Sequence, residues 1–244
     1  MNTRGIEDPA IRVAAVIPAA GAGLRMGGGV PKQFLEIDGR PLLALTLEAF
    51  ENCSAVDRVV LVVPSVEVDY CRRAIVERYC FKKVAAVVAG GKTRRDSVRL
   101  GLSAVGDEFD LVVVHDGARP LVRPLLIERV IDGARATGAA IAGIPARDTV
   151  KEVDGERVVK TCDREKVWLA QTPQAFRRTI LLDAHSRTEC RGEAEPTDDA
   201  SLVERAGGEV VVVPGDEDNI KVTTPRDIAL VKFLKSEAHG LGKN

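Results

Sequence analysis

The sequence has few aromatic residues and no long apolar run, and each shortage narrows the range of possible folds. Aromatic residues make up only 4% of the 244 residues, although 45% of the residues are hydrophobic. The core must therefore be built from Val, Leu, Ile and Ala, as in parallel α/β sheets. No apolar stretch reaches the roughly 18 residues that a membrane-spanning helix needs, so we expect no membrane association.

Cysteine and histidine are also scarce and scattered. The five cysteines form no C-x-x-C pair, and an odd number at irregular spacing fits reduced thiols. The three histidines lie far apart, so a His/Cys metal centre is not expected. Residues 1–10 carry charges and no apolar segment, unlike a signal or transit peptide. Together these features predict a cytoplasmic protein.

The chain also lacks a large net charge. Its 35 basic and 36 acidic residues give a formal net charge of −1. No lysine-rich tail or basic run stands out, which argues against a nucleic-acid partner.

The most informative stretch runs from Pro18 to Lys32 and contains five glycines and two cations. It follows an apolar run, Val13 to Ile17, that is typical of a buried parallel strand. Glycine allows a ligand to approach the backbone amides, and successive exposed N–H groups form an anion-binding nest. Because Arg25 and Lys32 add two positive charges, we interpret the stretch as a loop that holds a triphosphate. We further expect Gly27 to Gly29 to form a lid that becomes ordered when a nucleotide binds.

Two better-known glycine loops do not match this stretch. A Walker loop needs Gly-Lys-Ser/Thr, which is absent from the sequence. The dinucleotide fingerprint needs a third glycine where Met26 stands. The remaining alternative is an irregular surface loop whose glycines only make turns.

Strand-like and helix-like segments alternate along most of the chain, which indicates right-handed βαβ units. The fold class we predict is α/β, with a doubly wound, mainly parallel, Rossmann-like sheet in one domain over residues 11–238. The expected strands are residues 13–17, 57–63, 84–89, 111–114, 140–144 and 209–213. The expected helices are residues 42–52, 66–79, 94–104, 124–136, 178–189 and 225–235, with a further helix opening at 196–199.

Residues 151–160 break this alternation. They are highly charged, and Asp154-Gly155 between two alternating segments predicts a short hairpin. Since an isolated hairpin is only marginally stable in water, we expect an arm at about residues 147–172 that packs on a partner subunit. A solvated surface hairpin is the alternative.

Polar segments follow several of the expected strands, where ligands bind in open α/β sheets. The segments are Gly90 to Ser97, His115 to Pro120, Arg147 to Thr149 and Asp218 to Lys221. Asp116 is a candidate ligand for a hydroxyl or a magnesium ion, with a role as an N-cap or as the ion-pair partner of Arg119 as the alternative. We expect these loops to converge on one edge of the sheet.

Seven short motifs in order carry a resemblance to a known family. They are Pro18-Ala-Ala-Gly-x-Gly-x-Arg-Met with Pro31-Lys-Gln, Gly90-Gly-x-x-Arg-x-Asp-Ser, His115-Asp-Gly-Ala-Arg-Pro, Arg147-Asp-Thr, Thr172-Pro-Gln, Thr197-Asp-Asp and Asn219-Ile-Lys. Together they resemble the 2-C-methyl-D-erythritol 4-phosphate cytidylyltransferases, nucleotidyltransferases of the non-mevalonate isoprenoid pathway. The resemblance spans about residues 11 to 235 and implies a fold of the nucleotide-diphospho-sugar transferase type.

The resemblance implies that CMP passes from CTP to methylerythritol phosphate, with Mg²⁺ as cofactor and a homodimer as the assembly. Arg25, Lys32 and Lys221 would stabilise the transition state. The residues that would bind CTP are Pro18, Ala19, Ala20, Gly21, Gly23, Gly91, Arg94, Asp96 and Ser97. The residues that would bind the polyol phosphate are Asp116, Arg119, Thr149, Arg164, Thr172, Thr197 and Lys221. Thr149 and Arg164 would reach the neighbouring subunit's substrate, and Asp116 would lie near a magnesium ion held mainly by the CTP phosphates.

Two rival functions stay open at this point. A ribitol-5-phosphate cytidylyltransferase would share the CTP loops and differ in its polyol phosphate. A catalytically silent nucleotide-binding regulator would share the fold, but it has no need of three transition-state cations.

Overall fold

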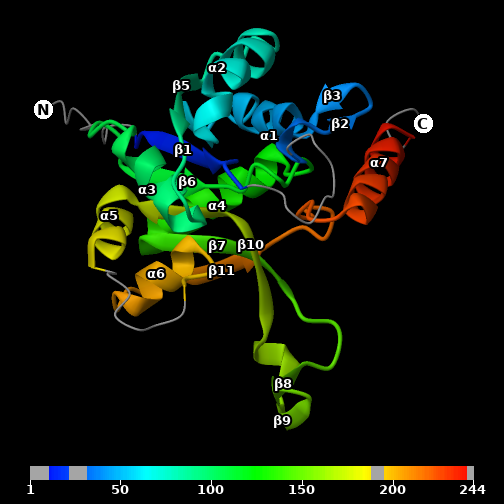
Figure 1. The fold of residues 1–244 in the computed structure, drawn as a ribbon. Coiled ribbons are helices and arrows are strands. Elements are labelled where there is room, and N and C mark those ends of the chain that lie inside the picture. The colour runs from blue at the N-terminus through cyan, green and yellow to red at the C-terminus, as the bar shows by residue number, and fades with distance from the viewer. Residues whose placement is uncertain (1–10, 22–31, 188–194, 241–244) are drawn as a thin grey trace, which may run out of the picture.

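The central element is a seven-stranded sheet with the strand order β11-β7-β10-β6-β1-β4-β5 (Figure 1). The computed structural model describes residues 11–21, 32–187 and 195–240. The strands are β1 Val13–Pro18, β4 Arg58–Val63, β5 Val84–Ala89, β6 Leu111–Val114, β7 Ala139–Pro145, β10 Trp168–Arg177 and β11 Val211–Pro214. All neighbouring pairs are parallel except those of β10, which runs antiparallel to both β6 and β7. The predicted mainly parallel sheet is therefore confirmed.

Helices cover both faces of this sheet, as a doubly wound fold requires (Figure 1). They are α1 Leu42–Glu51, α2 Val68–Cys71, α3 Arg94–Ser103, α4 Pro124–Thr137, α5 Arg178–Arg187 and α6 Asp199–Arg205, whereas α7 Pro225–Gly240 lies apart from the sheet (Figure 1). Side chains of β1 alternate between two apolar clusters. Val13 and Ile17 pack with α1 and α4, whereas Ala14 and Val16 pack with α3, α5 and α6. Burial on both faces explains why the strands are continuous apolar runs in the sequence.

β10 is the one long strand that the sequence did not predict. Its first residues, Trp168 to Ala170, are exposed, and Gln171 to Phe176 are buried between β6 and β7. The polar side chains of Gln171, Thr172 and Gln174, with Pro173, hide the strand pattern in this segment. The segment becomes a central strand because it pairs with β6 on one edge and with β7 on the other.

The predicted hairpin arm is present and projects away from the sheet (Figure 1). β8 Lys151–Asp154 pairs with β9 Arg157–Thr161, and every residue of both strands is exposed. The two turn residues are Gly155 and Glu156, one position later than the Asp154-Gly155 turn that we predicted. Gly155 has a φ of +56°, a left-handed conformation that glycine adopts readily.

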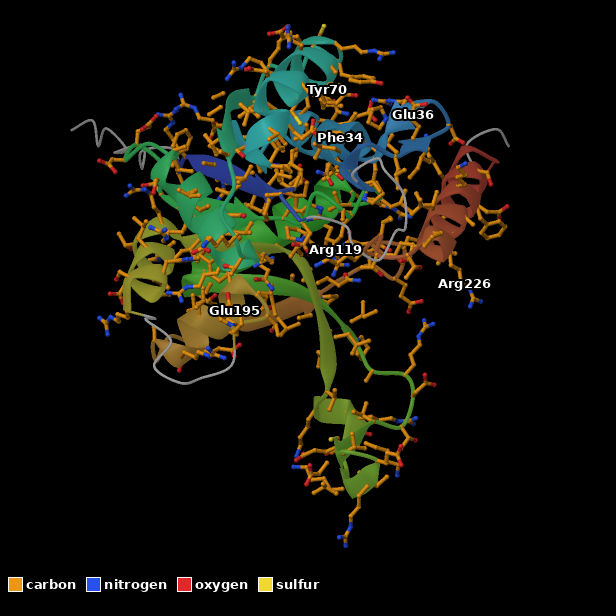
Figure 2. All side chains as sticks on the ribbon, viewed as in Figure 1. Phe34, Glu36, Tyr70, Arg119, Glu195 and Arg226 are labelled. Carbon is orange, nitrogen blue, oxygen red and sulfur yellow. The ribbon has the colours of Figure 1, made fainter. Side chains whose placement is uncertain are left out.

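Three smaller features complete the fold. The segment predicted as one helix over residues 66–79 is a 3₁₀ turn at Ser65–Glu67, then α2, then a π-helix at Arg72–Glu77. A short hairpin, β2 Glu36–Ile37 with β3 Arg40–Pro41, packs against α7. Phe34 and Tyr70 meet edge to face, with ring centroids 5.0 Å apart (Figure 2). In the part of the chain described, no helix has the length and apolarity needed to cross a membrane.

Candidate active site

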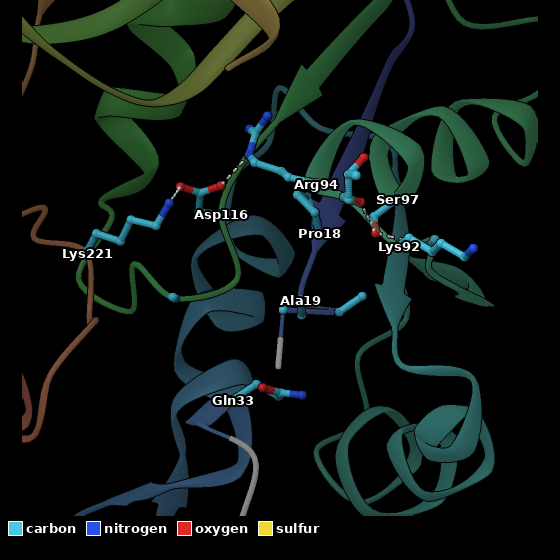
Figure 3. A pocket seen from close by; sticks show the side chains of 13 residues that line it. Pro18, Ala19, Gln33, Lys92, Arg94, Ser97, Asp116 and Lys221 are labelled. Carbon is cyan, nitrogen blue, oxygen red and sulfur yellow. Dashed lines mark hydrogen bonds and ion pairs between the residues drawn. The ribbon is translucent and has the colours of Figure 1, made fainter. Parts of the chain in front are cut away.

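A pocket opens at the carboxyl ends of β1, β5 and β6 (Figure 3). The strand order reverses at β1, which has β4 on one side and β6 on the other. Ligands of open α/β sheets bind at such a switch point. The described residues that line the pocket are Pro18, Ala19, Ala20, Gly21, Gln33, Gly91, Lys92, Thr93, Arg94, Ser97, Asp116, Ala118 and Lys221.

Backbone hydrogen bonds hold the loop after β1 in place. The Ala19 N–H donates to the Val62 carbonyl at 2.7 Å, and the Gly117 N–H donates to the Pro18 carbonyl at 3.1 Å. The loop is thereby tied to both neighbouring strands, so Ala19 to Gly21 form a stable wall of the pocket.

The loop between β5 and α3 forms the opposite wall and is held by its own side chains. Thr93 caps α3 in a reciprocal box: its hydroxyl accepts from the Asp96 N–H, and the Asp96 carboxylate accepts from the Thr93 N–H. The Ser97 hydroxyl accepts from the Gly91 N–H at 3.2 Å and donates to the Thr93 carbonyl at 3.0 Å. A capping box satisfies backbone donors at the helix start and so keeps this loop in one conformation.

Asp116 lies between two cations in the pocket (Figure 3). Arg94 Nε donates to Asp116 Oδ1 at 3.1 Å, and Lys221 Nζ lies 2.7 Å from Oδ2. Arg119 Nε is a third, more distant cation at 3.9 Å from Oδ2. These residues come from loops far apart in the sequence, and the fold brings them together as predicted.

A second set of contacts ties the same site to β10 and to the segment before α7. The Asp116 N–H donates to Thr172 Oγ1 at 3.0 Å, and Arg119 Nη1 donates to the Asn219 carbonyl at 2.6 Å. Asn219 Nδ2 in turn donates to the Thr172 carbonyl at 2.8 Å. The strand that the sequence analysis missed therefore supplies one of the residues that position Asp116.

The electrostatics of the site keep Asp116 charged and His115 neutral. Burial alone would raise the pKa of Asp116, but Arg94, Lys221 and Arg119 outweigh it and hold that pKa well below its usual range. Burial lowers the pKa of His115 to about 3, although Asp116 acts in the opposite direction. His115 Nε2 lies 3.3 Å from the Arg119 carbonyl, and the ring is fully buried. A buried, neutral His115 held in this way fits a structural role.

The buried ion cluster carries an excess of positive charge. Arg94 also donates to Asp199 through Nη1 at 2.7 Å. The three cations Arg94, Arg119 and Lys221 face two carboxylates, Asp116 and Asp199, which leaves one positive charge. A pocket of this charge is suited to an anionic ligand.

The remaining predicted site residues do not line the described part of the pocket. Thr197 is exposed and precedes α6, while Thr149 and Arg164 lie in the arm, where Arg164 Nη1 donates to the Arg147 carbonyl. Gly23, Arg25 and the proposed lid lie outside the described residues. Lys32 opens a 3₁₀ turn at Lys32–Phe34, and its side chain lies outside the described part.

Several residues without a predicted role lie at or behind the pocket. Gln33 is 2% exposed, and neither its amide oxygen nor its amide nitrogen has a hydrogen-bond partner. Lys92 lines the pocket, and Asp199 lies behind Arg94. The Pro31-Lys-Gln and Thr197-Asp-Asp motifs were the available signals, but a motif does not show which of its residues faces the ligand.

The fold and the cationic pocket at its switch point define a nucleotidyltransferase, and comparisons with known proteins give the family. The family model described as "2-C-methyl-D-erythritol 4-phosphate cytidylyltransferase" (IspD) matches residues 13–237. The chain belongs to this family, whose members are cytidylyltransferases. Nucleotidyltransferases of this kind generally use a divalent cation.

Individual relatives agree along nearly the full chain. The 2-C-methyl-D-erythritol 4-phosphate cytidylyltransferase of Geotalea uraniireducens is 48% identical over 229 residues, covering 93% of this chain and 98% of that protein. The protein of the same name from Bacillus licheniformis is 45% identical, covering 90% and 94%.

Solved structures show the same fold. The 4-diphosphocytidyl-2C-methyl-D-erythritol synthase of Anaerococcus prevotii has a TM-score of 0.81 at 32% identity, covering 93% of this chain and 96% of that one. The 2-C-methyl-D-erythritol 4-phosphate cytidylyltransferase of Thermus thermophilus has a TM-score of 0.74 at 36% identity, covering 92% and 98%.

Proposed function

We propose that this chain transfers CMP from CTP to 2-C-methyl-D-erythritol 4-phosphate, giving CDP-methylerythritol and pyrophosphate. A phosphate oxygen of the polyol attacks the α-phosphorus in line, and the bond from that phosphorus to the pyrophosphate oxygen breaks. The nucleophile is already an anion at neutral pH, so the reaction needs no general base. Positioning and charge neutralisation must then supply the catalysis. The observation that carries the proposal is the convergence of the two glycine loops with Asp116, Arg119 and Lys221 in a chain of this family.

The two halves of the pocket suit the two reactants. The backbone of Pro18, Ala19, Ala20, Gly21 and Gly91, with Gly23, Arg94, Asp96 and Ser97, would hold CTP. The loop requires glycine at position 91, because a Cβ there would lie 2.2 Å from the Asp96 Cβ. Asp96 would act through this loop, because its carboxylate is engaged in capping α3.

The polyol phosphate would bind at the other side, against Asp116, Arg119, Thr172 and Thr197. Lys221 lies between the halves and would bind the α-phosphate, leaving Asp116 as it does so. Arg25 and Lys32 would hold the triphosphate and stabilise the leaving group. Each such contact to a developing charge contributes about 3–4 kcal/mol to transition-state stabilisation.

The lining fits a magnesium ion held mainly by phosphate oxygens. Among the residues described, no group of three or more His, Cys, Asp or Glu side chains could form a metal site. Asp116 is the one acidic side chain among the described lining residues, and both of its oxygens already have cationic partners. Mg²⁺ commonly binds through one or two carboxylates together with substrate phosphates. When bound, it would neutralise phosphate charge, with Asp116 as its one protein ligand in the described part of the pocket.

We further propose that the protein is a cytoplasmic homodimer joined through the arm at about residues 147–172. The arm exposes several apolar side chains, and a group of exposed apolar side chains is typical of a protein–protein contact surface. They are Val153, Val158, Val159, Trp168 and Leu169, each between 41% and 58% exposed. Thr149 and Arg164 would then serve the neighbouring subunit's substrate site. The four described cysteines are free, in keeping with a reducing compartment.

Pyrophosphate release from CTP and Mg²⁺ tests the proposal, with methylerythritol 4-phosphate and ribitol 5-phosphate supplied in parallel. We expect strong preference for methylerythritol 4-phosphate. Preference for ribitol 5-phosphate would instead identify the protein as a ribitol-5-phosphate cytidylyltransferase. CTP binding without pyrophosphate release would indicate a silent regulator. Lys221→Gln should lower kcat at least about a hundredfold, whereas Lys232→Gln on exposed α7 is the matched control and should match wild type.

A further inference from the structure

We propose that Asp199 and His185 are positioning residues for the transfer reaction. They hold the Arg94 guanidinium, and through it the Asp116 carboxylate, in place while Lys221 moves from Asp116 to the reacting phosphate. This inference rests on the proposed function and adds to it two residues that lie outside the pocket.

The geometry is an unbroken row of hydrogen bonds and ion pairs that leads from the protein interior to the pocket. His185 Nε2 lies 3.0 Å from Asp199 Oδ1, and Arg94 Nη1 donates to Asp199 Oδ2 at 2.7 Å. Arg94 Nε donates to Asp116 Oδ1 at 3.1 Å, and Lys221 Nζ lies 2.7 Å from Asp116 Oδ2. Both oxygens of each carboxylate are therefore engaged, and Arg94 bridges the two.

The two inner side chains of this row are less exposed than the three that line the pocket, of which Asp116 is 10% exposed. The side chain of Asp199 is 0% exposed and that of His185 is 3% exposed, whereas Arg94 is 26% and Lys221 is 40% exposed. Asp199 does not line the pocket, so a direct contact with the reactants is not its role. A carboxylate buried this deeply persists only when it is paired and hydrogen-bonded. Burial would raise the pKa of Asp199, but Arg94 and His185 outweigh it and keep that pKa below its usual range.

The position of Asp199 is itself well determined. It is the first residue of α6, directly after the N-cap Asp198, whose carboxylate accepts from the Ser201 N–H. Gln174 on β10 joins this helix start to the sheet, donating to Asp198 Oδ2 at 2.7 Å and accepting from the Ala200 N–H at 3.2 Å. The start of α6 is thus a rigid base against which Arg94 can be held.

The support matters most at the moment of reaction. When Lys221 bonds to a phosphate oxygen, Asp116 Oδ2 loses its nearest described cation, and Arg119 Nε, at 3.9 Å, is the next one in the described part of the chain. Among the described side chains, Arg94 is then the one cationic group in close contact with Asp116. Arg94 Nη2 is also buried without a hydrogen-bond partner, and Arg94 lines the pocket. A guanidinium held by Asp199 therefore keeps Asp116 in position and presents one fixed donor to the reactants.

The test is a double-mutant cycle read in kcat/KM for the polyol phosphate. Asp199→Asn keeps the shape of the side chain and removes its charge, and we expect a loss of about tenfold to a hundredfold, in line with the cost of misplacing a binding group. In an Arg94→Met background the same change should alter kcat/KM by less than about twofold, because Asp199 acts through Arg94. An equal loss in both backgrounds, or wild-type kinetics for Asp199→Asn, would overturn the inference.

A matched control separates positioning from general loosening of the helix. Val203 lies on the same helix, is 1% exposed and belongs to the apolar cluster beneath it. Val203→Ala should lower the melting temperature and leave kcat/KM within about twofold of wild type. Equal kinetic losses for Val203→Ala and Asp199→Asn would reduce Asp199 to a structural residue. If Asp199→Asn does not fold, His185→Gln takes its place in the cycle, with the same coupling expected and the same refutation.

A spectroscopic readout keeps this inference distinct from the proposed function. In ¹H–¹⁵N spectra of the wild type, the Arg94 Nε–H signal, identified by its loss in Arg94→Met, should exchange slowly with water. Asp199→Asn should accelerate that exchange at least tenfold, whether or not the enzyme turns over the chosen polyol. Unchanged exchange would refute the positioning role, while failure of the wild type to release pyrophosphate would refute the proposed function alone.

Discussion

Replacing Gly90 by alanine should separate the two walls of the pocket. Gly90 follows β5, and a Cβ built there would lie 2.4 Å from the Ala20 Cβ and 2.9 Å from Ser97 Oγ. Ala20 and Ser97 both line the pocket, on opposite loops. Non-bonded carbons are in favourable contact at about 3.5–4.0 Å, so the loops must separate by roughly 1 Å.

This separation sets the expected magnitude. Misplacing binding groups by about 1 Å can cost about a hundredfold in rate, so kcat/KM for CTP should fall by that factor. Overpacking costs about 1–3 kcal/mol of stability, which for a chain of this size lowers the melting temperature by roughly 2–4 °C per kcal/mol. The variant should therefore remain folded while it loses most of its activity.

The assay is pyrophosphate release at varied CTP, together with thermal unfolding. Gly133→Ala is the matched control, because a Cβ there would lie 2.8 Å from the Ala140 Cβ, near the start of β7 and away from the pocket. Its kcat/KM should stay within about threefold of wild type. Its melting temperature should fall no further than that of Gly90→Ala, because replacing glycine by alanine inside a helix stabilises the helix by up to about 1 kcal/mol. Wild-type kinetics for Gly90→Ala, or an equal loss in the control, would refute the reasoning.

Two further predictions concern acid stability and assembly. Folded His115 stays neutral down to its pKa of about 3, whereas the unfolded chain takes up that proton below about pH 6.5. The unfolded state therefore binds more protons in this window, so the free energy of unfolding of the wild type falls as the pH is lowered. His115→Gln lacks this proton uptake, and between pH 7 and pH 5 its free energy of unfolding should rise by about 2 kcal/mol relative to that of the wild type. Denaturant unfolding curves of the two proteins that shift in parallel with pH would contradict this. Val158→Glu on the arm should convert a dimer to a monomer in sedimentation analysis, whereas Val66→Glu, at a site that is 86% exposed outside the arm, should not. A dimer that survives Val158→Glu would remove the arm from the interface.

Part of the fold was predictable from the sequence because the responsible interactions are local or depend on burial of a whole segment. β1, β4, β6 and β7 are apolar runs, since inner strands of such a sheet are covered on both faces, and the edge strand β5 is apolar although it is only partly buried. β10 was not predicted, because Gln171 to Gln174 are polar or proline and become a strand only between β6 and β7. The arm was predicted from its charge and its turn, but its turn residues lie one position later because the pairing of β8 with β9 determines them.

The same division applies to the candidate active site. The glycine loops, Asp116 and Lys221 were identified by residue chemistry and motif spacing, which the sequence carries by itself. The partners of these residues were not, because Arg94 meets Asp116 across 22 positions and Asp199 across 105 positions of the chain. Those contacts depend on the order of strands in the sheet and on the placement of α6 behind it. The sequence alone therefore determined which groups are available for phosphate chemistry. Only the tertiary structure decided which charges neutralise one another, because a charged side chain must have a partner of opposite charge once the fold buries it.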